Sequence, residues 1–453
     1  MPIKSILFLG AFGLCATGAL VEPMLGVLAY MAHYCIGAEN QWWAEPIRSW
    51  GIRYSFILGA TTAVGLLLQH WRLRFGASAL VGQEILALAF LAVVWLGVVW
   101  GWDSSGQEML AGQDPTCWKM TKVIFFALML THIVTTMADL DWIVWVLIVT
   151  AFILGLQAFD TPYEAFSSQG RLETVGGPDF RDSVILGGYL SAMLPIIGTQ
   201  FLRSKWLGKL VCVMAGAFVT NAVVLTRSRG AVVGLAVGSV AALLLAPGKH
   251  RKKILVGLAV AVAGGLYLVD RGFVERAQTI TASEEERDRS AQSRIEIWEG
   301  GVEMLLANPL GVGPDNFRKA IGHYSLQNPD RDAHNTFVRC AGELGFPGIL
   351  LYGALIGNAF KMLWGIVKKA RDLPAAERDR LTYMSYGIAI SIIIFLSAGQ
   401  TSSMVYIEGL WWLLLLPVSV ERALENARED LRPARVQITP GPACIPGNKL
   451  AGG

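Results

Sequence analysis

Segments of about 15 to 20 mostly apolar residues recur along nearly the whole chain, and they limit its fold more than any other feature. An α-helix rises about 1.5 Å per residue, so about 20 such residues cross a hydrocarbon core about 30 Å thick. Of the 453 residues, 53% are hydrophobic and 16% are charged, whereas soluble domains carry about 25% charged residues. We therefore expect an integral membrane protein built from helices, because lipid offers no hydrogen-bond partner to an open backbone.

These segments predict an all-α, polytopic membrane helix bundle of about 12 or 13 transmembrane helices with one long, partly helical periplasmic loop. The first two segments are separated only by Glu22-Pro23, so they form either one kinked span or a hairpin of two. The expected spans are 5–20, 23–37, 53–69, 83–101, 121–137, 141–157, 183–200, 206–225, 231–246, 254–270, 347–367, 382–397 and 403–420.

The basic residues predict the orientation of the bundle. Lys and Arg concentrate in the loops 70–74, 203–209, 248–253 and 368–380 and in the tail after Val420. Cytoplasmic loops of membrane proteins carry an excess of these residues, so this set is assigned to the cytoplasm together with the C-terminus. The opposite side then holds the segments 38–52, 102–120, 158–182 and 271–346.

The same pattern predicts four regions. They are N-terminal transmembrane helices in 1–270, a large periplasmic loop in 271–346, C-terminal transmembrane helices in 347–420 and a disordered cytoplasmic tail in 421–453.

Neither the net charge nor the cysteine content points to a nucleic-acid partner or a metal. The net charge of +3 gives no reason to expect a nucleic-acid partner. The six cysteines form no Cys-x-x-Cys pair and no metal-binding pattern. His323, His334, Asp330 and Asp332 are of types that bind metals, but they show no recognisable ligand spacing. We expect neither a metal nor a cofactor.

The long loop carries the stretches GVGPDNF and AHNTFVRCAGELGFPG. A mostly polar segment adds nothing to stability in a bilayer, so chemistry is expected here. From Arg294 onward, apolar residues recur at spacings of three and four, which predicts an amphipathic helix ending at Asn308-Pro309. The residues in this pattern are Ile295, Trp298, Val302 and Leu305. This apolar face either lies on the bilayer surface or caps the bundle.

Gly311, Gly313 and Phe317 resemble a phosphate-binding loop only superficially. No Walker lysine, preceding strand or following Rossmann unit accompanies them. The glycines instead predict a tight turn that packs the loop on the bundle, with Asp315 available to orient a partner.

His334 is the first candidate for catalysis. It precedes an apolar span, with Asn335 beside it and Arg339 just over one helical turn further along. An imidazole titrates near neutrality, so it can accept the proton of an attacking hydroxyl. A nearby guanidinium would lower its pKa and keep it neutral at working pH.

Four arginines are assigned to the same side as His334. Arg227 and Arg229 lie in LTRSRGAVVG between two apolar segments, Arg181 precedes another span, and Arg294 opens the amphipathic helix. They either anchor helix ends at the membrane surface or bind an anionic lipid headgroup, since guanidinium groups bind phosphate oxygens in pairs. Ser228 and Gly230 would add backbone N–H donors at the positive end of the next helix.

Three segments resemble the O-antigen ligase and polymerase superfamily. They are LTRSRGA, RIEIWEGGVEMLLANPLGVGPDNF and AHNTFVRCAGELGFPGILLY, and the similarity covers roughly residues 180 to 420. In the early part, EPMLGVLAYMAHY and WWAEPIRSWGIRYS are similar to the exosortase-associated branch of O-glycosylation ligases.

The resemblance implies a multi-pass glycosyltransferase of the bacterial inner membrane with its active loop in the periplasm. Such enzymes move a glycan from undecaprenyl diphosphate to an acceptor hydroxyl without a metal or a nucleotide sugar. The catalytic His of the family corresponds to His334 and the diphosphate-binding arginines to Arg229 and Arg294. This chain departs from the family pattern at GGPDFRDS, which leaves the role of Arg181 open.

The implied reaction is a single inverting transfer with His334 as general base. The acceptor hydroxyl belongs to the lipid A core, a growing polysaccharide or a protein side chain. The alternatives are a polymerase of O-antigen or exopolysaccharide, a transporter of inorganic carbon or a lipid-linked sugar, and a non-catalytic membrane scaffold. A carrier would show ionisable groups at the membrane midplane, whereas the polar residues here concentrate outside the bilayer.

Overall fold

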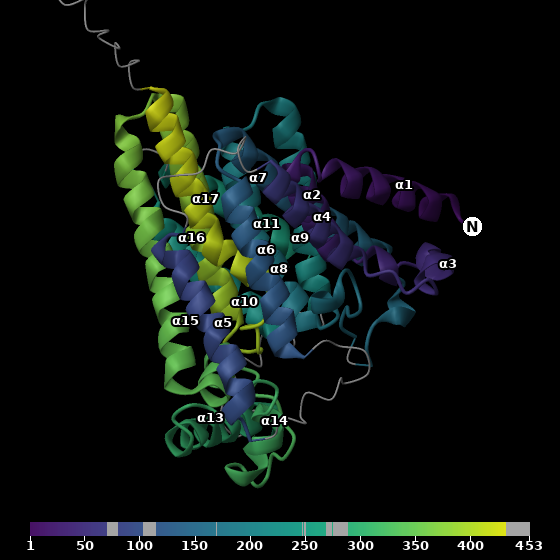
Figure 1. Ribbon diagram of the computed structural model, residues 1–453, viewed down its shortest axis with the longest axis vertical. Helices are drawn as coiled ribbons and strands as arrows, with labels where there is room; N and C mark the ends of the chain where they lie inside the picture. The colour runs from purple at the N-terminus through teal and green to yellow at the C-terminus, as the bar shows by residue number, and fades with distance from the viewer. Residues whose placement is uncertain are drawn as a thin grey trace, which may run out of the picture.

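The computed structural model describes residues 1–69, 80–102, 115–168, 170–246, 248, 251–268, 274 and 289–431. These residues form helices and loops and contain no β-strand. Long helices stand side by side in one bundle, and the segment with α13 and α14 covers one end of it (Figure 1). The predicted all-α membrane bundle is confirmed.

Each predicted span coincides with a helix in the described residues. These helices are α1 (Ile3–Gly18), α2 (Pro23–Ile36), α4 (Tyr54–Leu68), α5 (Gly82–Trp100), α6 (Thr116–Ile133), α7 (Met137–Asp160), α8 (Ser183–Arg203), α9 (Trp206–Thr226), α10 (Arg229–Leu245), α11 (Arg251–Leu268), α15 (Thr336–Lys369), α16 (Ala375–Ala398) and α17 (Glu408–Asp430). In these residues, six helices are long and apolar enough to cross a membrane, and α1, α4 and α10 are shorter apolar helices. The protein is therefore a multi-pass membrane protein.

The first apolar region forms two helices rather than one kinked helix. Pro23 occupies the first turn of α2, where its missing N–H breaks no helical hydrogen bond. The backbone of Glu22 is extended, which separates α2 from α1.

The ends that carry the predicted cytoplasmic loops lie together. Asp141 near the start of α7 accepts hydrogen bonds from Arg203 at the end of α8, at 3.0 Å, and from Arg380 in the first turns of α16, at 3.1 Å. The C-terminal end of α17 lies at this end of the bundle, opposite α13 and α14 (Figure 1). The basic loop at 70–74 and residues 249 and 250 of the one at 248–253 lie outside the described residues.

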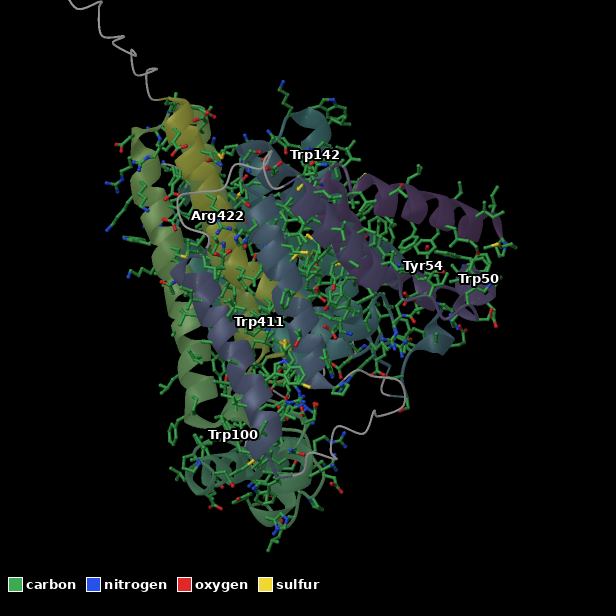
Figure 2. The ribbon with its side chains drawn as sticks, viewed as in Figure 1. Trp50, Tyr54, Trp100, Trp142, Trp411 and Arg422 are labelled. Atoms are coloured by element: carbon green, nitrogen blue, oxygen red, sulfur yellow. The ribbon has the colours of Figure 1, made fainter. Side chains whose placement is uncertain are left out.

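A buried ion pair joins three helices inside the bundle. The Arg422 guanidinium on α17 donates to both Glu84 carboxylate oxygens on α5, at 3.1 and 3.0 Å, and to the Thr131 carbonyl on α6, at 2.7 Å. Both charged side chains are buried, and Arg422 lies among the helices toward the end opposite Trp100 (Figure 2). Hydropathy does not identify this pair, because Glu84 and Arg422 lie far apart in the sequence.

The amphipathic helix of the long loop is α13, Arg289–Ala307. It starts before Arg294, and its buried face differs from the predicted one, because Ile295 and Val302 are exposed while Ile297 and Met304 are buried. These two residues form a small core with Phe317 of α14 (Phe317–Ala320), next to Val338 of α15. Of the two predicted placements, the structure shows the cap on the bundle.

Two glycines explain the error in the predicted face. A side chain at Gly301 would meet Val338, and one at Gly300 would meet Ile321. The absence of side chains at these positions lets α13 approach its neighbours closely. Glycine is neither clearly apolar nor clearly polar on a hydrophobicity scale. The helical turn of α13 that makes the closest contact is therefore not recognised as buried from the sequence.

The glycine-rich turn after α13 packs on the bundle, as predicted, and its partner there is a break in α15. Gly345 adopts φ 64° and ψ −162°, and Pro347 lacks the N–H that would bond to the Glu343 carbonyl in a regular helix. The Gly313 N–H supplies that bond at 2.9 Å. The Val312 N–H bonds the Gly342 carbonyl, also at 2.9 Å.

Helix α17 continues ten residues past the predicted start of the tail. The disordered tail was expected from residue 421, but the helix ends at Asp430. The buried Arg422 and Asn426 stabilise this extension, since Asn426 donates to the Thr135 carbonyl at 2.8 Å. Residues 432–453 lie outside the described part of the chain.

Candidate functional site

The segment before α15 positions His334. Its backbone is left-handed, with φ 45°, and the next residue, Asn335, caps α15. The Asn335 side-chain oxygen accepts hydrogen bonds from the N–H groups of Phe337, at 2.9 Å, and Val338, at 3.2 Å. The cap satisfies N–H groups that a helix start leaves open, and so fixes the direction in which the chain enters α15.

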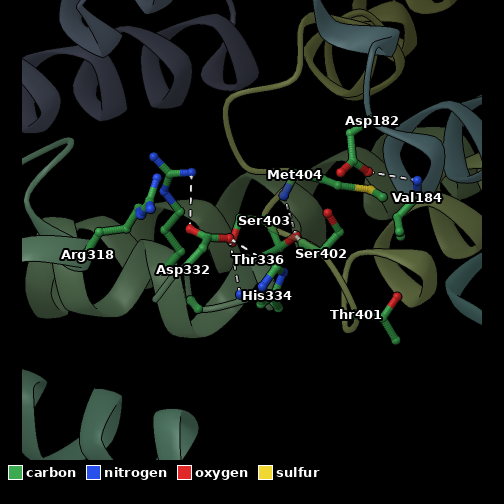
Figure 3. Close-up of polar contacts among 12 residues, drawn as sticks. Asp182, Val184, Arg318, Asp332, His334, Thr336, Thr401, Ser402, Ser403 and Met404 are labelled. Carbon is green, nitrogen blue, oxygen red and sulfur yellow. Dashed lines mark hydrogen bonds and ion pairs between the residues drawn. The ribbon is translucent and has the colours of Figure 1, made fainter. Parts of the chain in front are cut away.

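The connection between α16 and α17, residues 399–407, holds this segment from the other side. The Thr336 N–H donates to the Gly399 carbonyl, and the Thr336 hydroxyl donates to the Ser402 carbonyl at 2.9 Å. The same hydroxyl accepts from the Met404 N–H at 2.9 Å. Figure 3 shows His334 beside this connection, with Asp182 and Thr401 on the side away from Arg318.

Asp332 lies next to His334 and contacts it directly. Its Oδ2 accepts a hydrogen bond from the His334 backbone N–H at 3.2 Å and one from the Ser403 hydroxyl at 2.6 Å. The same oxygen is 4.0 Å from His334 Nδ1. The side chain of His334 remains 44% exposed, so its ring is accessible from outside.

Arg339 lies at the centre of a group of carboxylates. Its guanidinium is 3.1 Å from Glu343, 3.6 Å from Asp332 and 3.7 Å from Asp315, and it covers the ring of Tyr406. The Tyr406 hydroxyl donates to Glu343 at 2.7 Å. Arg339 therefore compensates carboxylates at the joint between the loop and the bundle.

Asp315 connects this group to α6. Its carboxylate accepts from the Thr116 N–H at 2.9 Å and from the Thr116 hydroxyl at 2.6 Å, at the positive end of the helix. The sequence suggested that Asp315 orients a partner. In the structure, Asp315 contacts Thr116 and Arg339, which belong to the same chain.

The surroundings of His334 favour its neutral form. Burial lowers its pKa, and the charges of Arg294 and Arg331 lower it further, against the opposing effect of Asp332 and Asp182. The lowered pKa of His334 agrees with the predicted effect of a nearby guanidinium, which Arg294 and Arg331 provide in addition to burial.

The Asp332 carboxylate is held ionised. Burial opposes its ionisation, but the charge of Arg339 and the hydrogen bond from Ser403 outweigh burial and hold the pKa of Asp332 below its usual range. His334 therefore faces a negative charge that persists throughout its own titration range.

Arg229 lies in the first turn of α10, close to the same connection. Ser228 caps this helix by accepting from the Ala231 N–H at 3.2 Å. Gly230 is so close to Thr401 that a side chain at that position would overlap the Thr401 hydroxyl. The start of α10 and the segment of His334 thus both contact residues 399–404.

Residues 214–353 match the family model of O-antigen ligases. This part of the chain is therefore similar to O-antigen ligases. This match supports a ligase- or polymerase-like function. It is shorter than the resemblance described above, and it includes every candidate site residue except Arg181. No curated protein matches the chain.

Two of the predicted arginines contact other loops at the same end of the bundle. Arg227 ends α9 in a left-handed conformation, and its guanidinium lies 3.5 Å from the Tyr163 hydroxyl and against Gly170. Arg181 is exposed and donates to the Asn40 side chain at 3.0 Å. Among the predicted cations, Arg294 is the one whose charge acts most on His334.

Sequence reasoning missed the roles of Asp332, Asp182 and Ser403. Asp332 entered only as one member of a metal-ligand set, which the structure does not assemble. His323 packs against the Trp102 ring instead, and the described residues contain no group of three or more side chains suited to a metal. An Asp two residues before a candidate His was an available signal, because Asp side chains often bind the backbone N–H two positions on.

Proposed function

We propose that this protein transfers a glycan from undecaprenyl diphosphate to an acceptor hydroxyl at the periplasmic face, with His334 as general base. One observation carries the proposal. An accessible imidazole, kept neutral by burial and by the charges of Arg294 and Arg331, lies where the loop meets the bundle. A neutral imidazole near physiological pH is the form that accepts a proton.

Arg229 and Arg294 are the proposed ligands of the diphosphate. Guanidinium groups bind phosphate oxygens through paired N–H donors, and the N-terminus of α10 adds the positive end of a helix dipole. Arg227 and Arg181 are proposed as further cations along the path of the donor. The donor's prenyl chain would remain in the bilayer, which the apolar helices imply as the surrounding medium.

The proposed reaction has one step and inverts the anomeric centre. His334 takes the hydroxyl proton while the acceptor oxygen bonds to the anomeric carbon, and the bond from that carbon to the diphosphate breaks. The diphosphate leaves as an anion that the arginines stabilise, so the step needs no protonated carboxylic acid. The proposal includes neither a metal nor another cofactor.

The proposed orientation places this end of the bundle in the periplasm and the C-terminus in the cytoplasm of a bacterial inner membrane. It is supported by the basic loops at 203–209 and 368–380, which lie at the opposite end. The acceptor is the lipid A core, a growing polysaccharide or a protein. A polymerase would extend the second of these.

Deletion of the gene identifies the product, and complementation tests the base. The deletion strain is expected to lose one class of product among lipopolysaccharide, exopolysaccharide and glycoproteins. The wild-type chain should restore it and His334→Ala should not, at equal abundance in the membrane. His323→Ala is the matched control in the same loop, and it should restore the product. Full restoration by His334→Ala would remove the base assignment.

A further inference from the structure

Asp332 binds the backbone of His334 and faces its ring. Its Oδ2 accepts the His334 N–H at 3.2 Å and lies 4.0 Å from Nδ1 of the imidazole. The His334 backbone has φ 45°, a conformation that residues other than glycine rarely adopt. A short-range acceptor for the N–H offsets the cost of this conformation, as in turns formed by Asp and Asn side chains.

Asp332 is itself held from two other elements. Ser403 in the connection between α16 and α17 donates to Oδ2 at 2.6 Å, and Arg339 on α15 lies 3.6 Å from Oδ1. The neighbouring Ala333 is fixed as well, because its carbonyl accepts from the Trp298 ring nitrogen of α13 at 2.9 Å. The carboxylate therefore has little freedom to turn away from His334.

We propose that Asp332 is the positioning residue of His334: its carboxylate fixes the left-handed backbone that directs the ring and faces the imidazole with a negative charge. The catalytic meaning of this arrangement rests on the proposed function, whereas the pairing itself does not. Asp332 touches neither substrate in this account, so it acts only through His334.

Four charges face His334. Asp332 and Arg331 belong to its own segment, Arg294 to α13 and Asp182 to the cap of α8. Asp332→Asn removes one of the two negative charges and keeps an oxygen that can accept from the His334 N–H and Ser403. Because a negative charge stabilises the imidazolium, its removal should lower the pKa of His334.

The test uses the full chain in lipid nanodiscs with isotope-labelled histidine. The His334 signal is assigned by its loss in His334→Gln, and its titration is followed by NMR. Asp332→Asn should move this titration to lower pH. Asp330→Asn is the matched control, since Asp330 is exposed, lies in the same segment and is not among the charges that act most on His334. An unchanged or raised titration midpoint in Asp332→Asn would overturn the proposal.

Transfer kinetics separate positioning from general damage. In Asp332→Asn, the acidic limb of the pH profile should move to lower pH together with the NMR titration, whereas a purely structural defect would lower the rate at every pH. Asp332→Ala also removes the acceptor for the His334 N–H, and kcat should fall on the order of a hundredfold. An unchanged kcat in that variant would contradict the positioning role.

The two proposals fail in different ways. If His334→Ala is active, the proposed function fails, while the NMR titration still decides whether Asp332 faces the ring. If His334→Ala is inactive and Asp332→Asn leaves both titration and profile unchanged, only the role of Asp332 is wrong.

Discussion

The basicity of His334 follows from the charges and the burial around one ring. Burial and two arginines lower its pKa, and two aspartates limit the decrease. Proton transfer requires the neutral imidazole, so the rate of glycan transfer should be at its maximum at neutral pH. It should be lost as the pH falls through a value below 6.5, the ordinary pKa of histidine.

Arg294→Gln tests this balance of charges. Removing a positive charge that disfavours the imidazolium should raise the pKa of His334, so the acidic limb of the rate should move to higher pH. The same variant should weaken donor binding and raise the KM for the lipid-linked glycan about tenfold or more, because a charged hydrogen bond contributes about 1.5–3 kcal/mol. The measurement is kcat/KM between pH 5 and pH 8.

Arg318→Gln is the control for that experiment. Arg318 is exposed and donates to the Asp330 carbonyl at 3.0 Å, and it is not among the charges that act most on His334. Its profile should coincide with that of the wild type. If the acidic limb of the pH profile moves to lower pH in Arg294→Gln, Arg294 does not lower the pKa of His334.

At the scale of elements, two glycine motifs form one joint. The break at Gly345 and Pro347 leaves carbonyls of α15 without an N–H partner in their own helix. The turn at Gly311 and Gly313 supplies the N–H groups that bond to these carbonyls. This joint fixes α13 and the start of α15 relative to the bundle, and so it fixes the position of His334. The sequence predicted the turn and its packing from the glycines, but the carbonyls that it binds emerge only in three dimensions.

Gly345→Ala should weaken this joint. The ψ of −162° at positive φ belongs to a region essentially limited to glycine, and an added side chain would overlap the Pro309 carbonyl. We expect a loss of about 3 kcal/mol in stability, measured as a lower unfolding temperature in detergent. Gly353→Ala on the same helix meets no atom within 4 Å and should change stability by about 1 kcal/mol or less. Equal effects of the two substitutions would contradict the account of the joint.

At the scale of the whole molecule, the apolar segments predicted the helices well because hydropathy reports directly on contact with lipid. The bundle interior was less accessible to prediction. The partners Glu84 and Arg422 are separated by 338 positions, and nothing local in the sequence couples them. The face of α13 was likewise wrong because glycines rather than apolar residues make its closest contacts.

Arg422→Met tests how far that buried pair stabilises the bundle. It leaves the Glu84 carboxylate buried without its cation, which should cost about 3–5 kcal/mol. Combining it with Glu84→Gln removes the uncompensated charge, so the double variant should unfold at a higher temperature than Arg422→Met alone. If the stability lost in the double variant equals the sum of the losses in Arg422→Met and Glu84→Gln, the two residues are not coupled.

The central claim is that His334 removes the acceptor proton at the periplasmic end of the bundle. The most direct measurement is the rate of glycan transfer by the purified chain in liposomes, with an undecaprenyl diphosphate-linked donor and the acceptor identified by the deletion strain. Replacing His334 by Ala should lower kcat about a thousandfold, within the range that general base catalysis contributes, with donor binding retained. Transfer by that variant at the wild-type rate would contradict the claim.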